Sequence, residues 1–217
     1  MKYKNFLFDL DGTLTDPYMG ITTSILHSLT YYPHITPPTR EELKPFIGPP
    51  LYASYMKYFD MDEKTANEAV AHYREYYSVK GKFENELYEG IKELLCELKK
   101  RGAKIIMATS KPKVFAKDIA EHFGISEYFD YICGSGLDGH LVDKDELIAH
   151  LMEVTPLKES ESVMIGDTLF DVMGAEKNGM DSIAVTYGYG VEKELRQSSA
   201  VAVADTVEEL ARLLLCD

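Results

Sequence analysis

The sequence predicts an α/β protein, with a doubly wound parallel sheet and a small all-helical domain inserted after the first strand. Short apolar runs that are typical of buried strands alternate with amphipathic helical patterns over most of the chain. Residues 16–83 interrupt this alternation with helical patterns alone. At 217 residues, the chain is long enough to bury a sizeable core beside a smaller insert.

The first strand is the apolar run Phe6–Phe8, which leads directly into the acidic turn D-L-D-G-T. Asp16 and Pro17 mark the end of this region, because proline disfavours helix in the residue before it and suits a helix start. The insert that follows has helical spacing at 21–29, 51–59 and 66–77, separated by proline-rich connectors. Its many tyrosines could stack on a substrate, but aromatic residues at helical spacing favour a place in the core.

The strand and helix alternation resumes near residue 84. An amphipathic helix over 91–98 is followed by three basic residues and a glycine stop. Strands are expected within 104–110, 128–136, 162–168, 181–188 and 200–205, and helices within 114–124, 144–154 and 170–179, with one more at the end. This order indicates a Rossmann-like sheet, whose binding crevice lies at the carboxyl ends of the strands.

Composition and charge exclude several classes of function. The net charge of −13 disfavours DNA, RNA and anionic membranes as partners. Residues 17–83 contain seven basic and seven acidic residues, so the whole excess of negative charge lies in the rest of the chain. No apolar run approaches the ~20 residues that span a bilayer, and the N-terminus does not resemble a signal peptide. Cys96, Cys133 and Cys216 are far apart, so we expect reduced thiols and a cytoplasmic location.

Chemistry-bearing side chains follow three of the predicted strands. Asp9 and Asp11 follow the first strand, and Gly12 allows the backbone to turn tightly behind them. The residues at the other two strand ends are Thr109, Ser110, Lys111, Gly166, Asp167 and Asp171. Because the carboxyl ends of parallel strands share one edge of a sheet, we expect all of these residues at one crevice.

A crevice of this kind would collect four carboxylates, from Asp9, Asp11, Asp167 and Asp171. Like charges within ~4–6 Å of one another destabilise a fold unless something neutralises them. Mg²⁺ prefers one or two carboxylates with water and phosphate oxygens, so the pattern predicts Mg²⁺ and a phosphoryl ligand. Taken alone, Asp167 could instead be a helix N-cap, and the acidic turn at Asp9 and Asp11 could cap a helix too.

A phosphoryl group also needs hydrogen-bond donors. Thr109 supplies a hydroxyl at the end of the second long strand. Lys144, at the start of a predicted helix, can bring an ammonium to the equatorial oxygens. Lys111 is the rival for that role, because it is closer to Thr109 in the sequence.

The motif D-x-D-G-T-L from Asp9 to Leu14 resembles the first motif of the haloacid dehalogenase-like hydrolase superfamily. Thr109 matches its second motif and Lys144 its third. The fourth is G-D-x-x-x-D, at 166–171, and the order is the one that the superfamily requires.

The stretch VMIGDTLFDVMGAEKNGMDSIAVTYGYG is similar to the bacterial phosphoglycolate phosphatase-like branch. Two departures are that Lys144 stands in D-K-D-E instead of K-P-x-P, and that Glu89 replaces a frequent proline. The resemblance implies a hydrolase core over 1–15 and 84–217, and a helical cap over 16–83.

The resemblance also implies roles for these residues. Asp9 would attack phosphorus and form an aspartyl-phosphate, and Asp11 would protonate the leaving alcohol and then activate water. Mg²⁺ would be held by the carboxylate of Asp9, the backbone carbonyl oxygen of Asp11 and the carboxylate of Asp167, with Asp171 orienting this group. The residues expected to bind the phosphate are Asp11, Gly12, Thr13, Thr109, Ser110 and Lys144, and those expected to act in catalysis are Asp9, Asp11, Thr109 and Lys144.

The expected function is Mg²⁺-dependent hydrolysis of a small phosphate ester such as phosphoglycolate. A 5′-nucleotidase acting on nucleoside monophosphates is the alternative, because the tyrosines of the insert could stack on a base. A phosphomutase and a non-catalytic regulator that binds a phosphorylated ligand are further alternatives. Dehalogenation is disfavoured, because dehalogenases of the superfamily lack an acid at the position of Asp11. The sequence does not determine the oligomeric state.

Overall fold

The computed structural model describes residues 2–215, so Cys216 lies outside the described residues. The chain divides into two compact units, one formed by Met1–Asp16 with Leu87–Asp217 and the other by Pro17–Glu86. Cys96 and Cys133 are free cysteines. Within the described residues, no helix is both long and apolar enough to cross a membrane.

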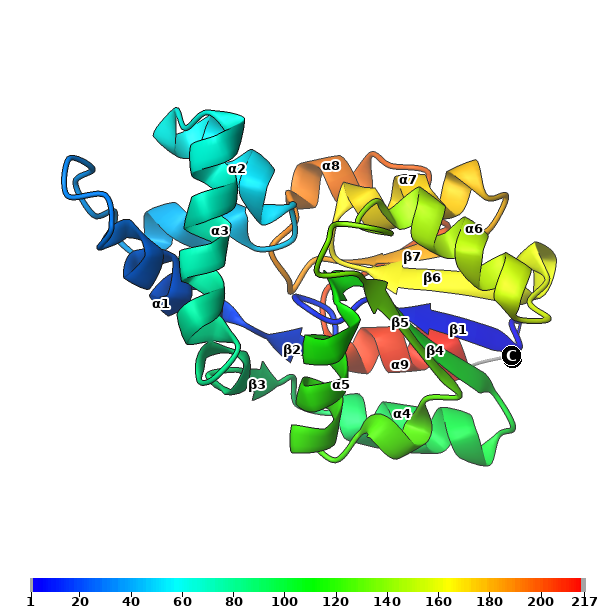
Figure 1. Ribbon diagram of the computed structural model, residues 1–217. Coiled ribbons are helices and arrows are strands. Elements are labelled where there is room, and N and C mark those ends of the chain that lie inside the picture. The colour runs from blue at the N-terminus through cyan, green and yellow to red at the C-terminus, as the bar shows by residue number, and fades with distance from the viewer. Residues whose placement is uncertain (1, 216–217) are drawn as a thin grey trace. The chain divides into compact units, whose positions relative to one another are not determined.

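The first unit contains a six-stranded sheet of order β5-β4-β1-β6-β7-β8, in which all pairs are parallel (Figure 1). This confirms the predicted α/β class. The strands are β1 (Asn5–Phe8), β4 (Lys104–Pro112), β5 (Tyr131–Ser135), β6 (Ser162–Gly166), β7 (Asp181–Val185) and β8 (Ala202–Ala204). The helices of this unit are α4 (Ile91–Lys100), α5 (Lys113–His122), α6 (Lys144–Val154), α7 (Leu169–Lys177), α8 (Glu192–Arg196) and α9 (Val207–Leu215), with 3-10 turns η3 (Ser126–Tyr128) and η4 (Glu159–Glu161).

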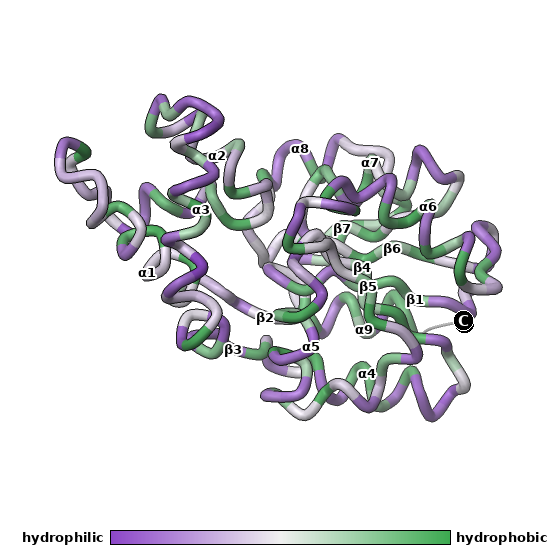
Figure 2. Tube along the Cα trace, viewed as in Figure 1, coloured by the Kyte–Doolittle hydropathy of each residue, from purple (hydrophilic) through white to green (hydrophobic). Residues whose placement is uncertain are grey.

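Helices cover both faces of this sheet, as the apolar character of its strands requires (Figure 2). Successive side chains of β1 point to opposite faces, so Phe6 and Phe8 pack with α4, α5 and α9, whereas Leu7 packs with α6 and α7. β1 lies between β4 and β6 in the middle of the sheet. The residues that follow these three strands therefore emerge at one edge.

The second unit is helical, with α1 (Tyr18–Leu29), η1 (Glu41–Phe46), α2 (Leu51–Phe59), α3 (Glu63–Tyr77) and η2 (Gly81–Phe83). Tyr55, Tyr73 and Tyr77 are buried in it, while Tyr52 and Tyr58 are exposed. Core packing therefore explains only some of the tyrosines of the insert. Two short strands, β2 (Thr15–Asp16) and β3 (Glu86–Leu87), pair in a separate two-stranded sheet that the sequence patterns do not predict.

Candidate active site

Backbone contacts fix the loop after β1, which carries Asp9 and Asp11. The amide of Asp9 donates to the carbonyl oxygen of Ile165 at 2.9 Å, which continues the alignment of β1 with β6. Gly12 has a φ of +79°, and a Cβ atom there would lie 2.1 Å from Oδ2 of Asp167. Only glycine fits this close approach, because any side chain would collide with a buried carboxylate. The amide of Gly12 itself donates to the carbonyl oxygen of Thr15 at 2.8 Å, inside the turn.

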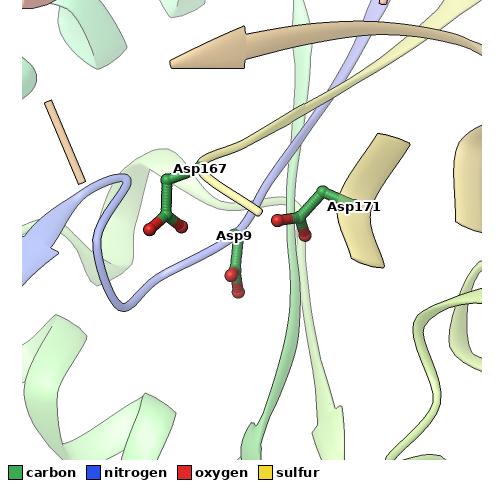
Figure 3. Close-up of side chains that lie close together, drawn as sticks. All are labelled: Asp9, Asp167 and Asp171. Carbon is green, nitrogen blue, oxygen red and sulfur yellow. The ribbon is translucent and has the colours of Figure 1, made fainter. Parts of the chain in front are cut away.

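Three aspartates, one directly after β1, one directly after β6 and one in α7, converge at this loop (Figure 3). Asp9, Asp167 and Asp171 are 7%, 1% and 1% exposed, and one oxygen of each lies within 4.8 Å of the others. Such a buried group of carboxylates suits a hard divalent cation, and oxygen-only donors favour Mg²⁺ over softer metals. Among the described residues, this is the one group of this kind, and it does not include the carboxylate of Asp11.

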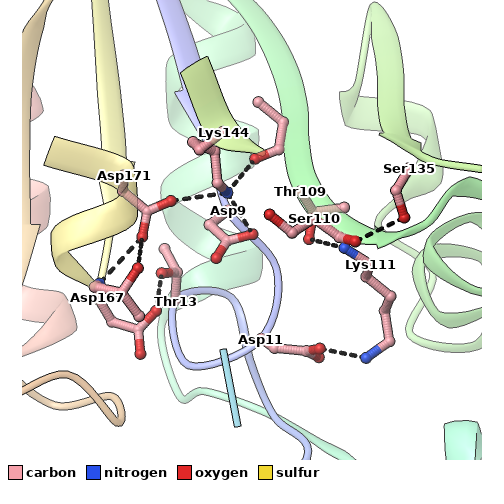
Figure 4. Close-up of polar contacts among 12 residues, drawn as sticks. Asp9, Asp11, Thr13, Thr109, Ser110, Lys111, Ser135, Lys144, Asp167 and Asp171 are labelled. Carbon is pink, nitrogen blue, oxygen red and sulfur yellow. Dashed lines mark hydrogen bonds and ion pairs between the residues drawn. The ribbon is translucent and has the colours of Figure 1, made fainter. Parts of the chain in front are cut away.

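Lys144 supplies one positive charge to this group (Figure 4). Its Nζ atom lies 3.1 Å from Oδ1 of Asp9 and 2.8 Å from Oδ1 of Asp171, and it donates to the carbonyl oxygen of Ala108 at 2.9 Å. Burial disfavours the ammonium, but the two carboxylates outweigh that effect and raise the pKa of Lys144. Lys144 is therefore in contact with two of the clustered aspartates, despite its unusual sequence context.

Asp167 is held from both sides. Thr13 donates its hydroxyl to Oδ1 at 3.2 Å, and the amide of Tyr189 donates to Oδ2 at 2.8 Å. Burial raises the pKa of Asp167 well above its ordinary value, and the charges of Asp171 and Asp9 add to the rise. A cation bound to these oxygens would remove that penalty, so the electrostatics of the site fit a metal.

The two carboxylate oxygens of Asp171 contact different groups. Its Oδ2 accepts hydrogen bonds from the amide and the hydroxyl of Thr168, at 3.1 and 2.7 Å, and its Oδ1 faces Lys144. Burial raises the pKa of Asp171, and Lys144 opposes that rise. Thr168, not Asp167, is the N-cap of α7, so the interpretation of Asp167 as a cap is wrong. The cap leaves Asp167 available for the site.

Asp11 has a different partner from the three clustered aspartates. Its Oδ2 forms an ion pair with Nζ of Lys111, at the end of β4. Burial raises the pKa of Asp11, and the ammonium of Lys111 opposes that rise. Lys111 and Lys144 are therefore not rivals for one place, because each ammonium serves a different carboxylate.

The end of β4 brings the predicted hydroxyl to the same edge. Thr109 is buried, and its Oγ1 accepts a hydrogen bond from the amide of Lys111 at 3.2 Å. The carbonyl oxygen of Ser110 accepts from the hydroxyl of Ser135 at 2.7 Å. The pairing of β4 with β5 shifts register between Thr109 and Pro112, which ends the regular ladder at the site.

Sequence reasoning missed the loop that follows β7. The hydroxyl of Tyr187 donates to the carbonyl oxygen of Thr13 at 2.9 Å, while Tyr189 holds Asp167 through its amide. Gly188 lies between them, where a Cβ atom would be 2.3 Å from the carbonyl oxygen of Gly12. The sequence did contain a signal for this loop, because two glycines alternate with two tyrosines just after a buried strand. Glycines at such positions indicate a close approach of the backbone to another group.

Comparisons with known proteins identify the family of this chain. The model of the haloacid dehalogenase-like hydrolase family matches residues 6–185. A 5′-nucleotidase of Pseudomonas aeruginosa is 48% identical, over 90% of this chain and 88% of that protein. A tyrosine-protein kinase of Mycobacterium tuberculosis is 38% identical, over 96% of this chain and 71% of that protein.

Among solved structures, a predicted phosphatase from Clostridium acetobutylicum has a TM-score of 0.94 to this chain at 46% identity. The similarity covers 99% of each chain. The family match over most of the chain therefore confirms the resemblance, and the chain is a phosphatase-type enzyme of the haloacid dehalogenase-like hydrolase family.

Proposed function

We propose that the protein is a Mg²⁺-dependent phosphomonoester hydrolase that acts through an aspartyl-phosphate on Asp9. The observation that carries the proposal is the position of Asp9, whose carboxylate lies with those of Asp167 and Asp171 and beside the ammonium of Lys144. This arrangement combines an anionic nucleophile with a place for a cation that screens it from an anionic substrate.

Asp9, Asp167 and Asp171 would hold the cation. When bound, Mg²⁺ would polarise the phosphoryl oxygens and offset the negative charge of the carboxylates. Thr13 and Tyr189 keep Asp167 in its orientation, and Thr168 does so for Asp171. These hydrogen bonds preorganise the ligands, which supports metal affinity.

The remaining roles go to residues of the same edge. Asp9 attacks phosphorus, and Lys144 and Thr109 hold oxygens of the transferred group. Asp11 protonates the oxygen that leaves and then, as a carboxylate, takes a proton from the water that cleaves the aspartyl-phosphate. The helical unit would exclude water during these steps and select the substrate, as the resemblance to capped members of the family implies.

We place nucleoside monophosphates first as substrates. The support is the relative named 5′-nucleotidase, which is 48% identical over 90% of this chain. Exposed tyrosines of the helical unit, such as Tyr52 and Tyr58, are able to stack on a base. A small metabolite such as phosphoglycolate is the second candidate, because the sequence resembles the phosphoglycolate phosphatase-like branch of the family.

Phosphate release from a panel of esters tests this function. The panel contains nucleoside monophosphates, phosphoglycolate, sugar phosphates and pyrophosphate, each assayed with Mg²⁺ and with EDTA. We expect metal-dependent release, with the nucleotides ranked first. Release that EDTA does not reduce would contradict the metal site. Transfer from ATP to a tyrosine peptide, without release from any ester, would instead place the chain with its kinase-named relative.

A further inference from the structure

Lys111 is a buried lysine whose ammonium the family motifs do not account for. Its Nζ atom forms an ion pair with Oδ2 of Asp11 (Figure 4). The side chains of Lys111 and Asp11 are 6% and 14% exposed. An ammonium in such surroundings is costly unless it is paired, so the position indicates a definite task.

The other carboxylate oxygen of Asp11 differs from Oδ2 in its contacts. Its Oδ1 atom is buried and has no hydrogen-bond partner among the described residues. One oxygen of the carboxylate is therefore engaged by a cation, while the other is available for a partner that the described residues do not provide. A buried acceptor without a partner is unfavourable, so its retention at a site calls for an explanation.

The backbone of Lys111 is itself fixed. Its amide donates to Oγ1 of Thr109 at 3.2 Å, and its carbonyl oxygen would lie 2.5 Å from a Cβ atom at Gly134. The lysine thus emerges from a tightly packed part of β4, next to β5. A side chain that starts from a fixed backbone and ends in an ion pair holds its partner in one orientation.

We propose that Lys111 is a positioning residue for the acid/base carboxylate. By holding Oδ2 of Asp11, it presents Oδ1 to the oxygen of the leaving group. This rests on the proposed function, in which Asp11 exchanges protons with that oxygen. Lys144 does not substitute for Lys111, because its ammonium contacts Asp9 and Asp171.

The step concerned is the formation of the aspartyl-phosphate. Asp11 enters this step as the carboxylic acid, with its proton on Oδ1 and with Oδ2 accepting from Lys111. The bond from Asp9 to phosphorus forms, the bond from phosphorus to the ester oxygen breaks, and the proton on Oδ1 moves to that oxygen. Asp11 is left as a carboxylate that the ammonium of Lys111 neutralises. An aliphatic alkoxide is a strong base and needs this proton, whereas p-nitrophenolate departs without one. Loss of Lys111 should therefore affect aliphatic esters selectively, which makes them the substrate class that the ion pair serves.

The test compares kcat/KM for p-nitrophenyl phosphate with kcat/KM for the best aliphatic ester of the panel, in the full chain with Mg²⁺. The ratio kcat/KM reports the steps up to aspartyl-phosphate formation and not its hydrolysis. In Lys111→Met, we expect a fall of about 10²-fold for the aliphatic ester and a much smaller fall for the aryl ester. Lys111→Arg, which still donates to Oδ2, should recover part of the loss.

Two variants serve as controls. Lys113→Met removes a nearby lysine whose Nζ lies 5.0 Å from the ring centroid of Tyr131, and both kcat/KM values should stay unchanged. Asp11→Asn removes the acid itself and should show the same selectivity for the leaving group as Lys111→Met. If Lys111→Met does not fold, Lys111→Gln takes its place.

An equal fall for both esters in Lys111→Met, or no fall for either, would overturn the proposal while Asp11→Asn remains selective. A lack of selectivity in Asp11→Asn as well would overturn the acid role of Asp11, and with it both the proposed mechanism and the role of Lys111. Selectivity in both variants, with partial recovery in Lys111→Arg, would support the assignment.

Discussion

The Nζ atom of Lys144 lies 2.8 Å from Oδ1 of Asp171, and both side chains are almost completely buried. The same ammonium lies 3.1 Å from Oδ1 of Asp9, so one cation serves two carboxylates that come from different elements of the sheet edge. In the absence of metal, this ion pair offsets much of the repulsion that the three clustered aspartates impose on the fold.

Removal of this cation should therefore be costly. We expect Lys144→Met to lower the free energy of unfolding in EDTA by about 3–5 kcal/mol, because it leaves two buried carboxylates without their counter-charge. Urea denaturation measures the loss. The double variant Lys144→Met with Asp171→Asn should be destabilised by less than Lys144→Met alone. Additive losses would show that the pair is not coupled.

Replacement of Asp9 separates chemistry from stability. Asp9→Asn removes the proposed nucleophile and one of several crowded anions, so turnover should be abolished while the thermal midpoint in EDTA stays the same or rises. Phosphate release and thermal unfolding are measured on the same preparation. Residual turnover close to that of the wild type would contradict the assignment of the nucleophile.

Binding of Mg²⁺ should stabilise the protein, because the three aspartates are assembled only in the folded state. We expect the thermal midpoint to rise with Mg²⁺ concentration in the wild type. In Asp167→Asn, the response should be small. A variant that responds as strongly as the wild type would place the cation elsewhere.

The raised pKa of Asp167 predicts a pH dependence of stability without metal. Burial, with the charges of Asp171 and Asp9, raises this pKa well above 3.8. A raised pKa stabilises the folded state while the group is protonated, and this contribution is lost as pH rises through the folded pKa. In EDTA, Asp167→Asn should therefore gain stability relative to the wild type as pH rises from 3.8 upward. A difference that does not change with pH would contradict this.

The loop after β7 offers a steric test. A Cβ atom at Gly188 would lie 2.4 Å from Cβ of Asp167, so Gly188→Ala must displace the loop that holds this aspartate. We expect a loss of about 1–3 kcal/mol in stability and a weaker response to Mg²⁺. Val191→Ala, at an exposed position nearby, is the matched control and should change neither. An unchanged Mg²⁺ response in Gly188→Ala would show that the loop does not support the site.

Much of the core could be predicted because its signals are local. The apolar run at Phe6–Phe8 and the helical spacing at 91–98 report burial directly, and both lie in the core as expected. The convergence of Asp9 and Asp167 followed from topology, since residues at the ends of adjacent parallel strands must share an edge.

The rest depends on contacts between distant parts of the chain. Lys111 pairs with Asp11 and not with the carboxylates that Lys144 contacts. A register shift between Thr109 and Pro112 interrupts the regular strand pattern around Lys111, so the sequence pattern does not predict this partner. The backbone amide of Tyr189 donates a hydrogen bond to Asp167. The pattern of side chains along the sequence does not predict backbone contacts of this kind. The strands β2 and β3 have two residues each and are too short for a periodic signal.

In the proposed mechanism Asp9 carries the phosphoryl group during turnover, and trapping that group on Asp9 is the most direct test. Asp11→Asn should form the aspartyl-phosphate with p-nitrophenyl phosphate and Mg²⁺ but hydrolyse it slowly. Acid quenching followed by peptide mass spectrometry should find one added phosphoryl group on the peptide that contains Asp9, and EDTA should prevent its formation. An unmodified Asp9 peptide under conditions that release p-nitrophenol, or modification at another residue, would contradict the account.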